Sequence, residues 1–113
     1  MKPSEQARLL RIFLGEGERF GHEPLYEAIV MKARELGFAG ATVLRGAMGY
    51  GATSHLHTAK VLRLSIDLPI VIEIVDSRER MDRLVPEMEA MLGRCLVTVS
   101  DVTVLNWSEA KGT

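Results

Sequence analysis

The order of apolar patterns in this 113-residue chain predicts an α+β protein with a ferredoxin-like βαββαβ fold, an antiparallel sheet that carries two helices on one face. Segments with the two-residue period of strands alternate with segments of helical period. A long loop that contains glycines separates the second and third predicted strands. No repeat, low-complexity segment or interdomain linker interrupts the pattern, so we expect one domain over residues 1–113, with a short disordered tail after about residue 107.

The first half of the chain supplies a strand, a helix and a second strand. Residues 7–14 alternate in the way that is typical of a strand with one buried face. Residues 24–36 place apolar side chains on one helical face, with Pro24 suited to the first turn and Gly37 to the helix end. Residues 41–44 begin a second strand because they are rich in β-branched side chains.

The second half repeats the pattern as strand, helix and strand. Residues 61–75 are nearly all strand-forming, but Pro69 cannot donate to a ladder and should mark a bulge or a sheet edge. Asp76 and Glu79 form a capping-box pattern that predicts the start of a second helix, which Gly93 ends. Residues 96–105 supply the last strand.

Composition excludes several classes of protein. A net charge of −1 and a pI of about 6.3 give no general attraction to nucleic acid or to an anionic membrane. The single cysteine, Cys95, excludes an intrachain disulfide. The sequence has no apparent signal peptide and no apolar run of about 18 residues that would span a bilayer. We therefore expect a cytoplasmic protein with no nucleic-acid partner and no direct membrane insertion.

The sheet face that the helices leave uncovered combines charged and apolar residues. Arg11, Arg63 and Glu73 lie on it among the apolar residues Leu9, Phe13, Val71 and Val75. Such a half-apolar face in a small protein usually meets another subunit, so we expect a homo-oligomer. An intersubunit pair with Arg11 or Arg63 then accounts for Glu73. A chain of this length builds no deep private cleft, which favours binding sites between subunits.

Four segments together are informative: Arg45-Gly46, Gly49-Tyr50-Gly51, residues 65–69 and residues 73–76. They resemble an uncharacterised family of PII-like proteins, domain-of-unknown-function family 190, of the PII signal-transduction superfamily, and the resemblance extends from residue 7 to about residue 105. It implies a homotrimer that binds adenine nucleotides in clefts between subunits and repositions the loop between strands two and three. It also implies that arginines at the start of the second helix reach phosphates in a neighbouring cleft.

The loop after the second strand carries the strongest candidates for anion binding. Successive backbone N–H groups of glycine loops cradle phosphates, and residues 46–51 have suitable spacing, although the Gly-Lys-Ser/Thr ending of a P-loop is missing. The alternative role of residues 46–51 is a flexible hinge that contacts no ligand. Arg45 can hold two phosphate or carboxylate oxygens, and its alternative is a salt bridge at the sheet edge or between subunits. The expected ligand-binding residues are Arg45, Gly46, Met48, Gly49, Tyr50, Gly51, Asp76, Arg78 and Arg80.

Other readings stay open at some of these positions and at the loop histidines. Asp76 also suits a helix cap, and the arginines near it suit a solvated face paired with Glu79 and Asp82. His55 and His57 are two residues apart, so in extended chain both can reach one metal ion, whereas the alternative is a pair of solvated loop side chains.

The sequence as a whole predicts a PII-like sensor that requires no cofactor. We expect it to bind a small anionic metabolite, with an adenine nucleotide as the leading candidate, and to signal to a protein target through residues 48–58. The alternatives are a metal-binding homotrimer that uses His55 and His57, or a small enzyme of unknown reaction. We expect no catalysis, because no nucleophile accompanies a matched base.

Overall fold

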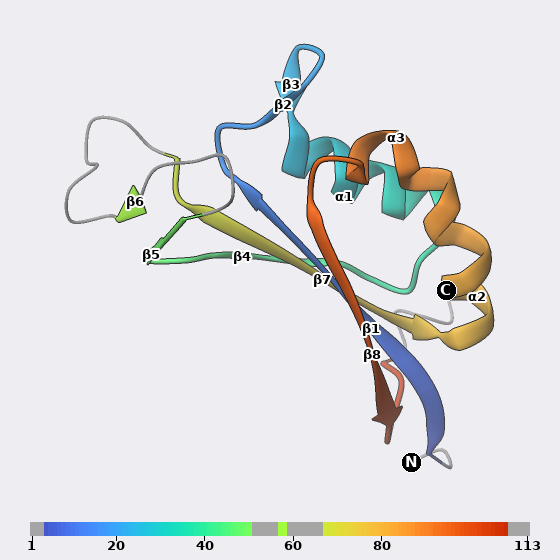
Figure 1. The fold of residues 1–113 in the computed structure, drawn as a ribbon. Coiled ribbons are helices and arrows are strands. Elements are labelled where there is room, and N and C mark those ends of the chain that lie inside the picture. Colours follow the sequence, from blue (N-terminus) through green and yellow to red (C-terminus); the bar gives the residue numbers. More distant parts are fainter. Residues whose placement is uncertain (1–3, 51–56, 59–66, 109–113) are drawn as a thin grey trace.

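The computed structural model describes residues 4–50, 57–58 and 67–108, and it has the predicted two-layer α+β architecture (Figure 1). Its antiparallel sheet has four strands in the order β4-β7-β1-β8. The strand bounds are β1 Glu5–Gly15, β4 Thr42–Arg45, β7 Pro69–Ser77 and β8 Leu96–Val104. The helical layer consists of α1 Leu25–Leu36, α2 Arg78–Leu84, the 3₁₀ turn η1 Val85–Met88 and α3 Glu89–Leu92. The predicted ferredoxin-like fold class is confirmed.

The two central strands, β1 and β7, form the middle of the core. β1 pairs antiparallel with β7 on one side and with β8 on the other. Side chains alternate across a strand, so every second residue of each strand faces the helices. These residues include Leu10, Ile12, Ile72 and Ile74, each at most 1% exposed. The alternation predicted for residues 7–14 is therefore confirmed.

Helix α1 lies across the sheet and ends where the sequence predicts. Gly37 adopts a left-handed conformation with φ of 88°, and the backbone N–H of Phe38 donates to Ala33 O at 3.1 Å. This is a common helix ending, in which glycine avoids the strain of a side chain at positive φ. At its start, α1 follows a short hairpin of β2 Arg19–Phe20 and β3 Glu23–Pro24, whose turn contains Gly21 at φ 64°.

The second helical segment differs from the prediction in two ways. Its N-cap is Ser77, whose side chain accepts a hydrogen bond from the Arg80 N–H at 3.2 Å. The expected capping box of Asp76 and Glu79 is therefore wrong. The segment is also not one continuous helix, because Pro86 lacks an N–H and the chain forms η1 between α2 and α3. Its buried stripe nevertheless continues, with Met81, Met88 and Leu92 all inside.

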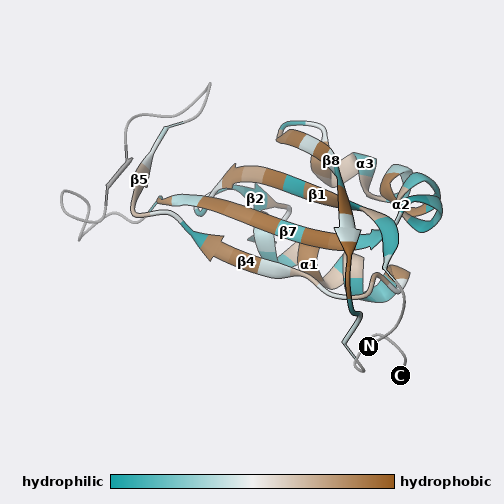
Figure 2. Ribbon diagram, turned by 90° about the horizontal axis from the view of Figure 1, so that it is seen from below, coloured by the Kyte–Doolittle hydropathy of each residue, from teal (hydrophilic) through white to brown (hydrophobic). Residues whose placement is uncertain are grey.

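Among the described residues, no helix or strand covers the sheet face opposite the helices, here called the open face (Figure 2). On this face Arg11 and Glu73 are direct cross-strand partners, and Arg11 Nε lies 2.9 Å from Glu73 Oε2. The expected intersubunit pair for Glu73 is thus formed within the chain by Arg11. Exposed leucines occupy the outer strands of the same face, Leu44 on β4 and Leu96 on β8. Together they make the open face a mixed apolar and charged surface.

Part of the long connection between β4 and β7 forms a small ladder of its own. β5 Met48–Gly49 pairs antiparallel with β6 His57–Thr58 (Figure 1). The sequence pattern did not predict this pairing. β7 begins at Pro69, a position where the missing N–H is tolerated, while residues 61–66 of the predicted strand lie outside the described residues.

Candidate functional site

The candidate site begins at the sheet end from which the long connection leaves. Arg45 is the last residue of β4 and pairs with Ile70 at the start of β7. The N–H of the next residue, Gly46, donates to Pro69 O at 2.7 Å. This bond fixes the point where the chain leaves the sheet, so both ends of the connection meet there.

The glycines at this point allow a close approach to the ring of Pro69. A Cβ on Gly46 would lie 2.8 Å from Pro69 Cγ, and a Cβ on Gly49 would lie 3.1 Å from it. Neither glycine has a positive φ, which among the described residues occurs only at Gly21 and Gly37. Gly46 and Gly49 therefore serve close packing on Pro69, whereas Gly51 lies outside the described residues.

Arg45 is paired within its own chain. Its Nη2 donates to Glu16 Oε2, and the Arg45 side chain remains 56% exposed whereas that of Glu16 is 14% exposed. The salt bridge that we considered as the alternative role of Arg45 is thus present, with an intrachain partner. The exposed part of the guanidinium still has N–H groups that face solvent and can meet an anion.

The short segment after β1 braces this end of the sheet. The N–H of Glu16 donates to Leu68 O at 2.9 Å, and the N–H of Gly17 donates to Asp67 Oδ1 at 2.6 Å. The Glu18 carboxylate accepts a bond from the N–H of Gly15 at 2.7 Å. The segment therefore connects Arg45, on one side of the loop, to the residues just before β7, on the other.

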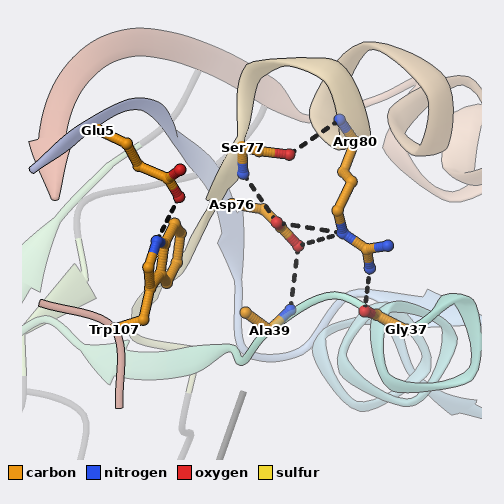
Figure 3. Close-up of polar contacts among 7 residues, drawn as sticks. All are labelled: Glu5, Gly37, Ala39, Asp76, Ser77, Arg80 and Trp107. Atoms are coloured by element: carbon orange, nitrogen blue, oxygen red, sulfur yellow. Dashed lines mark hydrogen bonds and ion pairs between the residues drawn. The ribbon is translucent and has the colours of Figure 1, made fainter. Parts of the chain in front are cut away.

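Asp76 and Arg80 lie in a second polar cluster, at the junction of β7 and α2 (Figure 3). The Asp76 side chain is completely buried, and Arg80 Nε lies 3.2 Å from each of its oxygens. Asp76 also accepts hydrogen bonds from the backbone N–H groups of Ala39 at 3.1 Å and Ser77 at 2.7 Å. Arg80 in turn donates to Gly37 O. The cluster thus joins the end of α1 to the start of α2.

These two groups of predicted ligand residues lie at opposite ends of the sheet (Figure 1). Asp76 follows Ile70, the partner of Arg45, by six residues along β7. At about 3.3 Å per residue the separation is roughly 20 Å. One chain therefore does not bring Arg45 and the Asp76–Arg80 region together, and a shared site requires a second subunit. Met48, Tyr50 and Arg78 are exposed.

Two residues that the sequence did not indicate, Glu16 and Arg94, make contacts at the sheet end from which the long connection leaves, and Glu16 is the one that contacts Arg45. Glu16 lies in a segment that the pattern describes only as a connection, so its pairing with Arg45 had no local signal. Arg94 lies just before β8, whose first residue, Leu96, pairs with Phe13 near the same end. Arg94 Nη2 donates to Arg19 O at 3.3 Å. Its only signal in the sequence was its place after the predicted helix end.

The metal hypothesis is not tested by the described part of the chain. His55 lies outside it, and the side chain of His57 is also not described. Within residues 4–50 and 67–108, no group of three or more His, Cys, Asp and Glu side chains is arranged to hold a metal ion. Cys95 lies just before β8, where burial and, to a lesser extent, the Glu18 carboxylate raise the pKa of its thiol.

Comparison with known proteins identifies the family. Residues 7–104 match the family DUF190, described as Uncharacterized ACR, COG1993. The chain belongs to this family. A UPF0166 protein of Aquifex aeolicus (strain VF5) is 39% identical over 98 residues, which cover 87% of this chain and 92% of the relative. The predicted membership of this PII-like family is confirmed.

Solved structures support the same assignment at the level of the fold. CPII, a nitrogen regulatory PII-like protein from Thiomonas intermedia K12 bound to ADP, AMP and bicarbonate, has a TM-score of 0.67 at 18% identity, covering 91% of this chain and 92% of its own. The divalent ion tolerance protein CutA1 from Ehrlichia chaffeensis has a TM-score of 0.59 at 13% identity, covering 88% and 84%. This member of the DUF190 family therefore has a PII-like fold. No helix among the described residues is long and apolar enough to cross a membrane.

Proposed function

We propose that this DUF190 protein is a PII-like regulatory protein that binds a small anionic ligand between the subunits of a homotrimer. The proposal rests on the position of Arg45: its side chain is about half exposed, and it lies at the base of the long loop in a PII-like fold. The structural neighbour CPII was solved with ADP, AMP and bicarbonate, all of them anions. That likeness supports the class of ligand, and Arg45 supplies the matching chemistry.

An adenine nucleotide is the leading candidate for the ligand. A guanidinium binds two phosphate oxygens at once, and charge-assisted bonds of this kind are about twice as strong as neutral ones. Arg78 offers a second exposed guanidinium at the far end of the sheet. Because roughly 20 Å separates the two ends within one chain, Arg45 of one subunit and Arg78 of another would share a cleft only in an oligomer.

The open face provides a surface for this oligomer. It carries the exposed leucines Leu44 and Leu96 beside the neutral Arg11–Glu73 pair, a composition suited to contact with other copies of the chain. The protein would act without catalysis. Ligand binding at Arg45 and Gly46 would bias the loop that contains β5 and β6, and a protein target would read residues 48–58.

A thermal-shift titration tests the proposal. Wild-type protein should be stabilised saturably by ADP, AMP or ATP, and about 2.7 kcal/mol is expected at 100 times the dissociation constant. R45A should lose most of the shift. R34A, which removes an exposed arginine from the last turn of α1, should keep it.

Other outcomes would redirect or reject the proposal. A shift with Zn²⁺ or Cu²⁺ alone would favour the metal-binding alternative, in which case an H55A/H57A variant should lose it. A shift with bicarbonate alone would keep the anion site and exclude the nucleotide. The absence of a shift with any nucleotide or inorganic anion would reject anion sensing.

A further inference from the structure

We infer that the Glu16 carboxylate is a built-in competitor for the anion site, which holds Arg45 until an anionic ligand displaces it. This inference rests on the proposed function, because it assumes that Arg45 receives the ligand. In the structure Glu16 Oε2 accepts a hydrogen bond from Arg45 Nη2, as a phosphate or carboxylate oxygen of a ligand would. The Glu16 carboxylate therefore makes with Arg45 the same kind of bond that an anionic ligand would make.

The environment of Glu16 makes the pair easy to open. Its second oxygen, Oε1, is buried and has no hydrogen-bond partner among the described residues. A buried carboxylate oxygen without a partner carries an uncompensated desolvation penalty. When a ligand takes Arg45, the Glu16 side chain can turn outward, and water can then hydrate both oxygens. The release of Glu16 thus offsets part of the free energy needed to break the pair.

Arg45 is placed for such an exchange because it is not locked. More than half of its side chain is exposed, in contrast to Arg80, which is 33% exposed and binds both oxygens of a fully buried carboxylate. Among the described residues, Arg45 donates to one carboxylate oxygen, whereas Arg80 binds a carboxylate and also donates to a backbone carbonyl. Of the three arginines among the expected ligand residues, Arg80 joins two structural elements, whereas Arg45 is available to a ligand.

The same carboxylate is coupled to the far side of the loop through its backbone. The N–H of Glu16 donates to Leu68 O, and the next N–H, that of Gly17, donates to Asp67. Glu16 therefore contacts both ends of the loop: its carboxylate pairs with Arg45 at the end of β4, and its backbone N–H bonds to Leu68 just before β7. Release of the carboxylate would remove the side-chain half of this connection.

The expected effect follows from competition. A ligand that needs a free Arg45 binds with an apparent affinity reduced by the fraction of time that Arg45 is free. If Glu16 occupies Arg45 for about nine-tenths of the time, the dissociation constant rises about tenfold. Removal of the carboxylate should therefore tighten binding, which is the opposite of what loss of a ligand-contacting residue does.

Calorimetric titration of the full-length protein with ADP tests the competition. E16Q, and E16A as a second variant, should bind ADP about three to ten times more tightly than wild type. E18Q removes the same charge two residues away, where the carboxylate contacts the Gly15 N–H, and should change the dissociation constant less than twofold. R45A/E16Q should bind no better than R45A, because no guanidinium remains to be released. Melting temperatures verify that each variant is folded.

A second readout needs no nucleotide. Phenylglyoxal modifies accessible guanidinium groups, and mass spectrometry of the modified peptides gives the rate at Arg45. That rate should rise in E16Q and stay at the wild-type value in E18Q. An unchanged rate in E16Q would overturn the inference, whatever the ligand.

The outcomes separate the inference from the proposed function. If R45A weakens ADP binding while E16Q leaves it unchanged or weaker, the competitor role is wrong and the anion site stands. If R45A binds ADP like wild type, Arg45 is not in the site and the inference is overturned with it. If neither wild type nor any variant binds ADP, the nucleotide proposal fails, and the phenylglyoxal rate at Arg45 in E16Q alone decides the inference.

Discussion

Asp76 and Arg80 form an ion pair in which the guanidinium Nε lies 3.2 Å from both oxygens of a carboxylate with no solvent exposure. Two backbone N–H groups, those of Ala39 and Ser77, complete the bonding of the carboxylate. Burial of a charge is tolerated only when partners satisfy it in this way. The pair therefore holds the connection after α1 against the start of α2 and should stabilise the folded state.

We predict that D76A is strongly destabilised. Removal of one partner from a buried pair typically costs about 3–5 kcal/mol, and the lower end applies because Arg80 can partly reach solvent. Urea denaturation measures the loss. S77A, which removes only the helix cap, should cost about 1 kcal/mol. Equal losses in the two variants would show that Asp76 acts as a simple cap after all.

Substitution on the open face should weaken self-association. L44K places a charge among the residues expected to meet another subunit, and it should convert the oligomer to a 12.5 kDa protomer in light scattering after size exclusion. M31K changes a comparably exposed apolar residue on α1 and should leave the mass unchanged. A wild-type protein that is itself monomeric at micromolar concentration would contradict the oligomer.

G46A should loosen the base of the long loop. The added Cβ would lie 2.8 Å from Pro69 Cγ, too close for real contacts, and overpacking of this kind costs about 1–3 kcal/mol. G40A is the matched control, because its Cβ would meet no described residue beyond its chain neighbours within 4 Å and its φ is not positive. The double variant G46A/P69A, which removes the proline ring that the added Cβ contacts, should recover part of the lost free energy of unfolding. A double variant as unstable as the sum of both singles would refute this close-packing role.

Cys95 should contribute a pH-dependent part of the stability. Burial, and then the Glu18 carboxylate, raise the pKa of its thiol in the folded state. The resulting stabilisation is present below the pKa of the unfolded thiol and is lost as the pH rises through the folded pKa. In urea unfolding between pH 7.5 and 10.5, wild type should lose more stability than C95S. Parallel pH profiles would contradict the raised pKa.

The elements that the sequence predicts correctly depend on local patterns. The alternation in β1 and β7 and the Gly37 helix end are determined by side chains within a few positions of each other. Pro86 indicated that the second helix would be interrupted, but the continuous helical period of the apolar residues favoured one helix over its whole length. The β5–β6 ladder could not be predicted, because two-residue strands have no period of their own.

The parts of the site that the sequence missed depend on contacts between distant positions. The Asp76 carboxylate contacts Ala39, 37 residues away, so its apparent cap pattern was misleading. Glu16 and Arg45 are 29 residues apart, and the pairing follows only from the way β1 and β4 flank β7. The candidate ligand residues could be recognised in the sequence from their side-chain chemistry. Their partners could be identified only once the fold was known, because they come from distant positions in the chain.

The most direct test of a ligand site at Arg45 is hydrogen exchange, followed by mass spectrometry, with and without saturating ADP. Our account predicts that ADP slows exchange in residues 46–50, that peptides from the centre of β1 do not change, and that R45A loses the protection. ADP binding without slower exchange at 46–50, or with full protection in R45A, would contradict it.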